Sequence, residues 1–140
     1  MTGIQLTRAA ITARLERDRD LSGANLSGMD LAGMDLAAAN LRDAILVGAD
    51  LHGAVLTEAA LSGADLTGAN LRGANLVRAV LSRYRDEHGS QSEAILVRAD
   101  LTGADLTGAD LRRVELGEAT LARTTLTGTQ MAGARLIQAN

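Results

Sequence analysis

The sequence predicts an all-β solenoid, and three features of a five-residue period indicate it: a leucine, a small residue before it and a glycine-rich slot after it. From Leu21 to Leu81 every fifth residue is leucine, and from Leu96 to Leu136 the same slot departs from leucine once, at Met131. Five α-helical steps would rotate a leucine by about 140°, and five strand steps would move it to the opposite sheet face. The leucines can share one interior if the backbone bends once in every repeat.

The other slots of the repeat agree with a coil of short segments. Two places before the leucine, sixteen of twenty-two residues are Ala, as expected for a second inward position with room for a methyl group. Asp or Asn most often directly precedes the leucine, where a short polar side chain can bond nearby backbone and favour a bend. Gly recurs two places after the leucine, where a corner can use its free φ. The inward slot departs from Ala at Arg19, Met29, Met34, Val114, Thr124 and Thr129.

The pattern Ala-(Asp/Asn)-Leu-x-Gly resembles the pentapeptide-repeat family, over residues 19–140 apart from one gap. This resemblance implies a right-handed quadrilateral β-helix with four pentapeptides in each coil. Adjacent coils would be about 4.8 Å apart, the spacing of hydrogen-bonded strands, so five or six coils would form a rod about 25 to 30 Å long.

Both ends of the repeat array should be covered, because unpaired backbone at an open β edge invites aggregation. Residues 3–18 predict a short N-terminal capping helix, in which Ile4, Ile11 and Leu15 share a face and Thr2 and Gln5 have capping-box spacing. No helix is expected after the last repeat. Either the sequence is trimmed after residue 140, or the last coil meets another copy of itself. Some family members dimerise through their C-terminal ends, so the resemblance makes the C-terminal coil a candidate homodimer interface.

One segment interrupts the leucine pattern, residues 82–93, with the sequence SRYRDEHGSQSE. The near-copies AILVGADL at 44–51 and AILVRADL at 94–101 fall on the same face if the segment leaves the coil, so we expect an external loop between the repeats of 19–81 and 94–140 in a single domain, 1–140. Loops of this kind matter for topoisomerase protection in some quinolone-resistance members of the family. The resemblance therefore makes Arg83, Tyr84 and Arg85 candidate partner-binding residues.

Four apolar residues fall in slots that should face outward on one side of the coil: Ile45, Val47, Ile95 and Val97. They are also candidate partner-binding residues, because exposed apolar side chains together can form an interaction patch. The alternative is that the loop folds back and Tyr84 covers them.

Catalytic residues are not predicted, because the sequence offers little material for them. It has no cysteine, and its two histidines, His52 and His88, lie thirty-six residues apart without an evident nucleophile or orienting acid. A row of Asp30, Asp50, Asn70 and Asp100 could hold a cation, but Asn replaces Asp freely there, so a role at the corners is favoured. We predict no metal, no cofactor and no enzyme.

The composition also restricts the partners. The net charge is −3 and every basic residue is Arg, without a basic stripe, so direct nucleic-acid binding is not expected. No signal peptide or membrane span is visible, which predicts a cytoplasmic protein. The sequence therefore predicts a non-catalytic protein-interaction scaffold of unknown partner. The alternative, implied by the resemblance, is a DNA-mimicking modulator or protector of DNA gyrase or topoisomerase.

Overall fold

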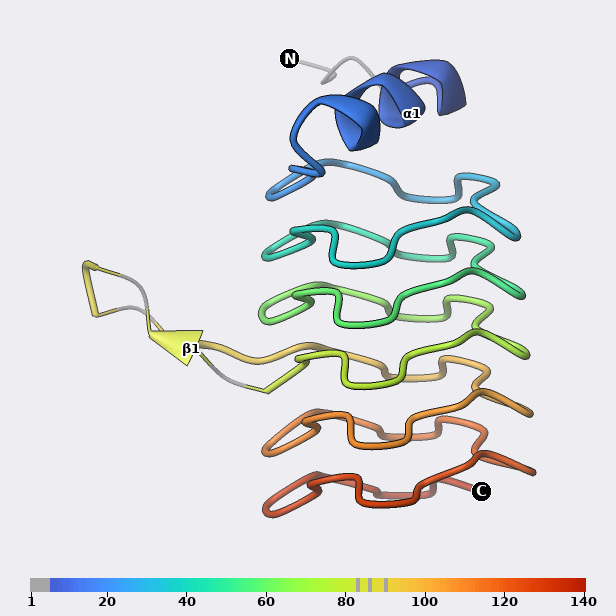
Figure 1. Cartoon of the computed structure of the whole chain (residues 1–140). Helices are drawn as coiled ribbons and strands as arrows, with labels where there is room; N and C mark the ends of the chain where they lie inside the picture. Colours follow the sequence, from blue (N-terminus) through green and yellow to red (C-terminus); the bar gives the residue numbers. More distant parts are fainter. Residues whose placement is uncertain (1–5, 83, 86, 90) are drawn as a thin grey trace.

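The structure, a computed structural model, describes residues 6–82, 84–85, 87–89 and 91–140. Helix α1 spans Arg8–Arg17, and two short strands, β1 (Tyr84–Arg85) and β2 (Gln91–Ser92), pair antiparallel. Figure 1 shows α1 lying across one end of a stack of coils and the β1–β2 hairpin projecting sideways from the stack. Most of the other described residues form the coils, which isolated parallel bridges connect.

The bridges establish the number of sides in each coil. Asp20 pairs with Asn40 and Asn25 with Ile45, so residues twenty apart stack and each coil contains four five-residue sides. Across the hairpin the spacing becomes thirty, as between Asp65 and Ile95, so that coil holds ten additional residues. The near-copies around Ile45 and Ile95 consequently lie on the same face.

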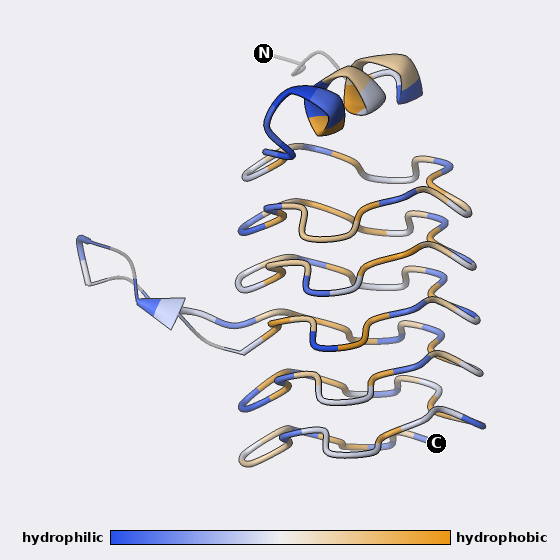
Figure 2. Ribbon diagram, in the orientation of Figure 1, coloured by the Kyte–Doolittle hydropathy of each residue, from blue (hydrophilic) through white to orange (hydrophobic). Residues whose placement is uncertain are grey.

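The interior consists of the leucines and the small residues before them. Every repeat leucine from Leu21 to Leu116 is 0 % exposed, and Ala fills most of the second inward position. In the last coil, Leu126 and Leu136 are 39 % and 44 % exposed. Each fully buried leucine contributes about 1.5 to 3 kcal/mol through removal of apolar surface from water. Figure 2 shows hydrophobic segments in register from coil to coil and a mainly hydrophilic hairpin.

The Asp/Asn slot has a specific hydrogen-bonding role at the corners. A side-chain oxygen there accepts a bond from the backbone N–H two residues later, at 3.0 Å from Ser22 to Asp20 and at 3.1 Å from Val77 to Asn75. This N–H does not take part in the ladder between coils, so the side chain replaces water as its partner. Asn serves as well as Asp because either residue supplies the oxygen.

Asp105 provides a test of this role through pH. Hydrogen bonds from the side chain and the backbone N–H of Thr107 hold the pKa of Asp105 below its ordinary value. Such a carboxylate stabilises the fold above its unfolded pKa of about 4. That contribution is lost as pH falls through the lower, folded pKa. We expect Asp105→Asn to unfold at a slightly lower urea concentration than wild type at pH 7, because it keeps the acceptor but lacks the charge, and to lose less stability than wild type on acidification to pH 2.5.

Asp105→Ala is the contrasting variant, because alanine removes the acceptor as well as the charge. It should unfold at a lower urea concentration than Asp105→Asn at pH 7. Equal midpoints for the two variants would contradict the hydrogen-bonding role of this slot.

Helix α1 packs on the first coil through Ile11 and Leu15, which are buried. Its N-cap is Thr7, whose Oγ1 accepts a bond from the Ala10 N–H at 3.1 Å. The expected cap at Thr2 and the apolar contact of Ile4 lie outside the described residues. No helix in the described part of the chain combines the length and apolar character that a membrane crossing requires.

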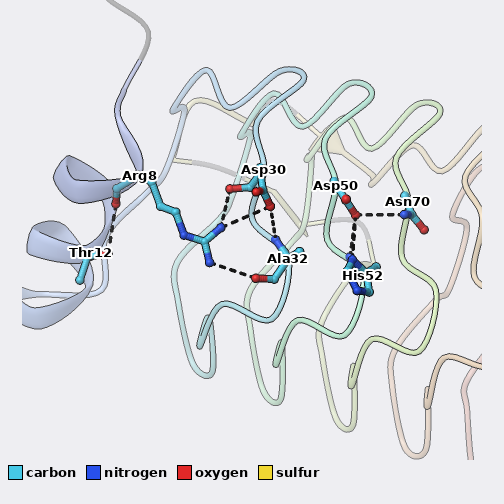
Figure 3. A network of polar contacts seen from close by, with 7 residues as sticks. All are labelled: Arg8, Thr12, Asp30, Ala32, Asp50, His52 and Asn70. Atoms are coloured by element: carbon cyan, nitrogen blue, oxygen red, sulfur yellow. Dashed lines mark hydrogen bonds and ion pairs between the residues drawn. The ribbon is translucent and has the colours of Figure 1, made fainter.

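Two arginines bind the carbonyl groups of the first coil. Arg8 reaches from α1 and donates from Nη1 to the Asp30 carbonyl at 2.7 Å and from Nη2 to the Ala32 carbonyl at 3.0 Å (Figure 3). Arg19 does the same on the next side, to the carbonyls of Asp35 and Ala37 at 3.0 and 2.6 Å.

The same carbonyl positions accept backbone N–H groups deeper in the stack. The carbonyls of Asp50 and His52 occupy these positions in the second coil. They accept bonds from the first coil, from the Leu31 N–H at 2.7 Å and the Gly33 N–H at 2.9 Å. Each guanidinium fork therefore takes the place of two N–H groups from a preceding coil.

Candidate protein-interaction site

The hairpin is attached to the solenoid by its tyrosine. The Tyr84 hydroxyl donates to the Asp43 carboxylate, and the Arg42 guanidinium carbon lies 5.8 Å from the centre of the Tyr84 ring, within cation–π range. Asp43 belongs to a coil two levels nearer the N-terminus than the root of the hairpin, since Asn40 stacks on Ala60 and Ala60 on Val80. The hairpin therefore leans toward the N-terminal coils.

Gly63 permits this close approach. A Cβ atom at residue 63 would overlap the Asp43 carboxylate and lie 2.9 Å from the Cβ of Ser92 in β2. The backbone of Gly63 also has φ +76°, a conformation that side chains disfavour. A larger residue at this corner would displace either Asp43 or the hairpin.

The candidate residues of the loop have different positions. Tyr84 is half-buried against the solenoid, Arg85 is exposed, and Arg83 lies outside the described residues. Arg42 and Asp43, which hold the hairpin, were not singled out from the sequence. The sequence contained one indication that Asp43 is unusual, since it occupies the slot where glycine recurs. In the structure Asp43 adopts φ +57°.

The four apolar candidates lie on one face but do not form a continuous patch. Asp65 stands between Ile45 and Ile95 in their column, and Thr67 stands between Val47 and Val97. Ile45 and Val47 are 41 % and 37 % exposed, whereas Ile95 and Val97 are half-buried. The hairpin therefore does not bury Ile45 or Val47.

The row of acidic residues is engaged in local bonds. Arg8 pairs with Asp30, the Asn70 amide donates to Asp50 at 3.0 Å, and Arg72 binds Asp100 at 3.0 Å (Figure 3 shows the first two). Hydrogen bonding from Thr102 lowers the pKa of Asp100. Among the described residues, no three Asp, Glu, His or Cys side chains are arranged to hold a metal ion.

His52 lies next to this row, with Nδ1 3.5 Å from an Asp50 oxygen. Its side chain is 62 % exposed. This arrangement gives His52 a carboxylate neighbour on an open surface.

Asp43→Ala should release the hairpin without unfolding the solenoid. Tyr84 would lose its carboxylate acceptor, while the buried leucines would remain in place. Tyr84 is the single tyrosine and the chain lacks tryptophan, so its fluorescence anisotropy reports on the hairpin directly. We expect the anisotropy to fall and the urea midpoint of the solenoid, followed by circular dichroism, to stay near wild type.

Glu118→Ala is a matched control for Asp43→Ala, because Glu118 is an exposed acidic residue at another corner, with φ +57°. It should leave the Tyr84 anisotropy unchanged. An equal fall in both variants would contradict the anchoring role of Asp43.

Solved structures similar to this chain share its solenoid. A trypsin-treated form of QnrB1, a plasmid-mediated fluoroquinolone resistance protein, matches with a TM-score of 0.68 and 23 % identity over 86 % of this chain and 61 % of that chain. At this identity the likeness shows the fold alone, and this chain spans about three fifths of the QnrB1 chain. The search of curated proteins found no significant match.

A second similar structure is alr5209, a pentapeptide repeat protein from Nostoc PCC 7120. It matches with a TM-score of 0.66 and 30 % identity over 89 % of this chain and 95 % of that chain. The family model for pentapeptide repeats matches eight copies, over residues 20–57, 44–83, 92–121 and 104–140. Members of this family fold as right-handed quadrilateral β-helices, in agreement with the four-sided coils described above. The chain therefore belongs to the pentapeptide repeat family.

Proposed function

We propose that this chain is a non-catalytic, cytoplasmic protein-interaction scaffold that presents its hairpin and the neighbouring outer face to a protein partner. The observation that carries the proposal is the anchored hairpin, which Tyr84 holds against Arg42 and Asp43. An anchored projection loses less conformational entropy on binding than a free loop.

The position of the exposed apolar residues supports the same surface. Ile45 and Val47 lie two and four residues after the anchoring residue Asp43 in the chain, and both side chains are exposed. A partner that contacts the hairpin on this side could also bury Ile45 and Val47. Ile95 and Val97 would extend the contact along the same face.

The test compares proteins retained from a lysate by the immobilised chain and by two double variants. Ile45→Thr with Val47→Thr should lose specifically retained proteins. Val55→Thr with Val77→Thr, which alters half-buried valines on a different side, should keep them. The proposal is wrong if the wild type retains no protein specifically while the purified chain turns over a small substrate.

A second candidate is a modulator or protector of DNA gyrase or another topoisomerase. The solenoid likeness to QnrB1 and the projecting hairpin support it. Direct DNA mimicry is less well supported, because arginines pair with the carboxylates that such a surface needs: Asp30, Asp35, Asp100 and Asp110. A supercoiling assay with and without a fluoroquinolone decides it. No inhibition and no protection at micromolar protein would end this candidate.

Self-association through the C-terminal coil is part of the proposal. The exposed Leu126, Leu136 and Ile137 support it, the last with 73 % of its surface accessible. Sedimentation equilibrium should give twice the monomer mass of 14.5 kDa. Ile137→Glu should return the monomer mass, and an unchanged mass in this variant would place any dimer contact elsewhere.

A further inference from the structure

A cleft of about 640 Å³ lies on the other side of the hairpin root, away from Tyr84 and its anchor. Ser82 and Glu93 of the root form one wall, and the other wall comes from the two C-terminal coils through Arg112, Arg113 and Arg135. Among the described residues, three guanidinium groups and the Glu93 carboxylate line the cleft. Its volume is within the range of small-molecule sites.

Two of the arginines are held in place by ion pairs. Arg112 binds Asp110 with both Nε and Nη2, at 2.9 and 2.7 Å, and the Ser82 hydroxyl donates to the same carboxylate at 2.8 Å. Arg135 pairs with Glu115. These contacts use part of the five N–H donors of each guanidinium, so donors remain for another acceptor.

Arg113 differs from the other two. Among the described residues, no hydrogen bond or ion pair engages its guanidinium, and the residue is exposed at a corner with φ +66°. A Cβ atom at Gly133 would lie 3.3 Å from the Cγ of Arg113, so the side-chain stem of Arg113 runs close over the bare backbone of Gly133. Gly133, in the next coil toward the C-terminus, leaves room for the aliphatic part of the Arg113 side chain. The Arg113 guanidinium keeps all its N–H donors.

We infer that this cleft binds an oxyanion, a phosphate or carboxylate group, with Arg113 as the principal donor and Arg112 and Arg135 as its neighbours. A guanidinium matches two oxygens of either group in a bidentate arrangement. Asp110 neutralises the charge of Arg112, and Glu115 neutralises that of Arg135. The charge of Arg113 has no such partner among the described residues, so it is available to a ligand. Binding in this cleft involves neither the exposed apolar residues nor the protein partner of the scaffold.

The test follows the arginine side-chain NMR signals at low ionic strength during titration with inorganic phosphate and, separately, with an acetylated triglutamate peptide amide. At least one probe should shift the Arg113 Nε–H signal saturably. Saturation by phosphate alone assigns a phosphate ligand, and saturation by the peptide alone assigns an acidic protein segment. Arg113→Gln should weaken the binding about tenfold.

Arg123→Gln is the matched control, because Arg123 is also an exposed corner arginine, with φ +58°, and does not line the cleft. It makes the same change in net charge and should alter the dissociation constant less than twofold. Both variants keep the buried core, so thermal unfolding verifies that each is folded. The inference is overturned if neither probe saturates, or if Arg123→Gln weakens binding as much as Arg113→Gln.

Discussion

Leu66→Ala is expected to lower the free energy of unfolding by about 3 kcal/mol, because it opens a cavity that the surrounding coils cannot close. Leu66 is 0 % exposed in the middle of the stack. Its own N–H donates to the Ile95 carbonyl of the next coil at 2.7 Å, so the backbone is fixed in the ladder on that side. Urea unfolding followed by far-ultraviolet circular dichroism measures the loss.

Leu136→Ala is the matched control, since it makes the same change at the same slot of the last coil. Its side chain is 44 % exposed, so we expect a loss of less than about 1 kcal/mol. Similar losses at both positions would contradict a continuous leucine interior. A broadened transition in Leu66→Ala would show that coils on either side unfold separately, which repeat architectures permit.

The interior could be predicted because the five-residue period is incompatible with a straight helix or strand. Leu21 and Leu66 needed no long-range information, since each repeats its neighbours. The four-sided coil was different, because the period gives the length of a side but does not give the number of sides. That number depends on the angle at each corner, and it came from the family resemblance.

At the corners, the backbone conformation of a residue does not always follow its own φ preference. Glycine was expected in the positive-φ slot, and Gly48 has φ 64°. Ala38 and Arg113 adopt φ 52° and 66° in the same slot, although positive φ is unfavourable for their side chains. The hydrogen bonds of the ladder and the buried leucines on either side impose this conformation, so sequence propensity alone would not place these corners.

The candidate site was predictable in location but not in its contacts. The loss of leucine after Leu81 marked the segment that leaves the coil. The Tyr84–Asp43 bond joins residues 41 positions apart, and no local pattern encodes such a pairing. The oxyanion cleft escaped prediction for the same reason, because Glu93 and Arg113 become neighbours when the hairpin root and the C-terminal coils fold together.

Replacing both Arg8 and Arg19 by methionine should lower the free energy of unfolding by about 2 kcal/mol and loosen the first coil. Methionine keeps an apolar stem but removes the donors that bind the carbonyls of Asp30, Ala32, Asp35 and Ala37. Each charge-assisted bond contributes more than a neutral one when buried, but Arg8 is exposed, so water recovers part of the loss. Amide hydrogen exchange should accelerate in residues 21–38 and change little beyond residue 60.

Arg8→Lys separates charge from geometry, because an ammonium group keeps the positive charge but cannot present a planar pair of N–H groups to two carbonyls. We expect the free energy of unfolding of Arg8→Lys to lie between those of wild type and Arg8→Met. Arg14→Met is the control for the loss of an arginine from α1, since among the described contacts Arg14 makes no side-chain hydrogen bond to the first coil. If Arg14→Met destabilised the first coil as much as Arg8→Met, general attraction between the helix and the acidic coil would explain the effect. If Arg14→Met left the first coil stable, the guanidinium groups of Arg8 and Arg19 would be replacing the N–H donors of a preceding coil. The double variant would then expose unpaired carbonyls, and sedimentation velocity should show increased self-association.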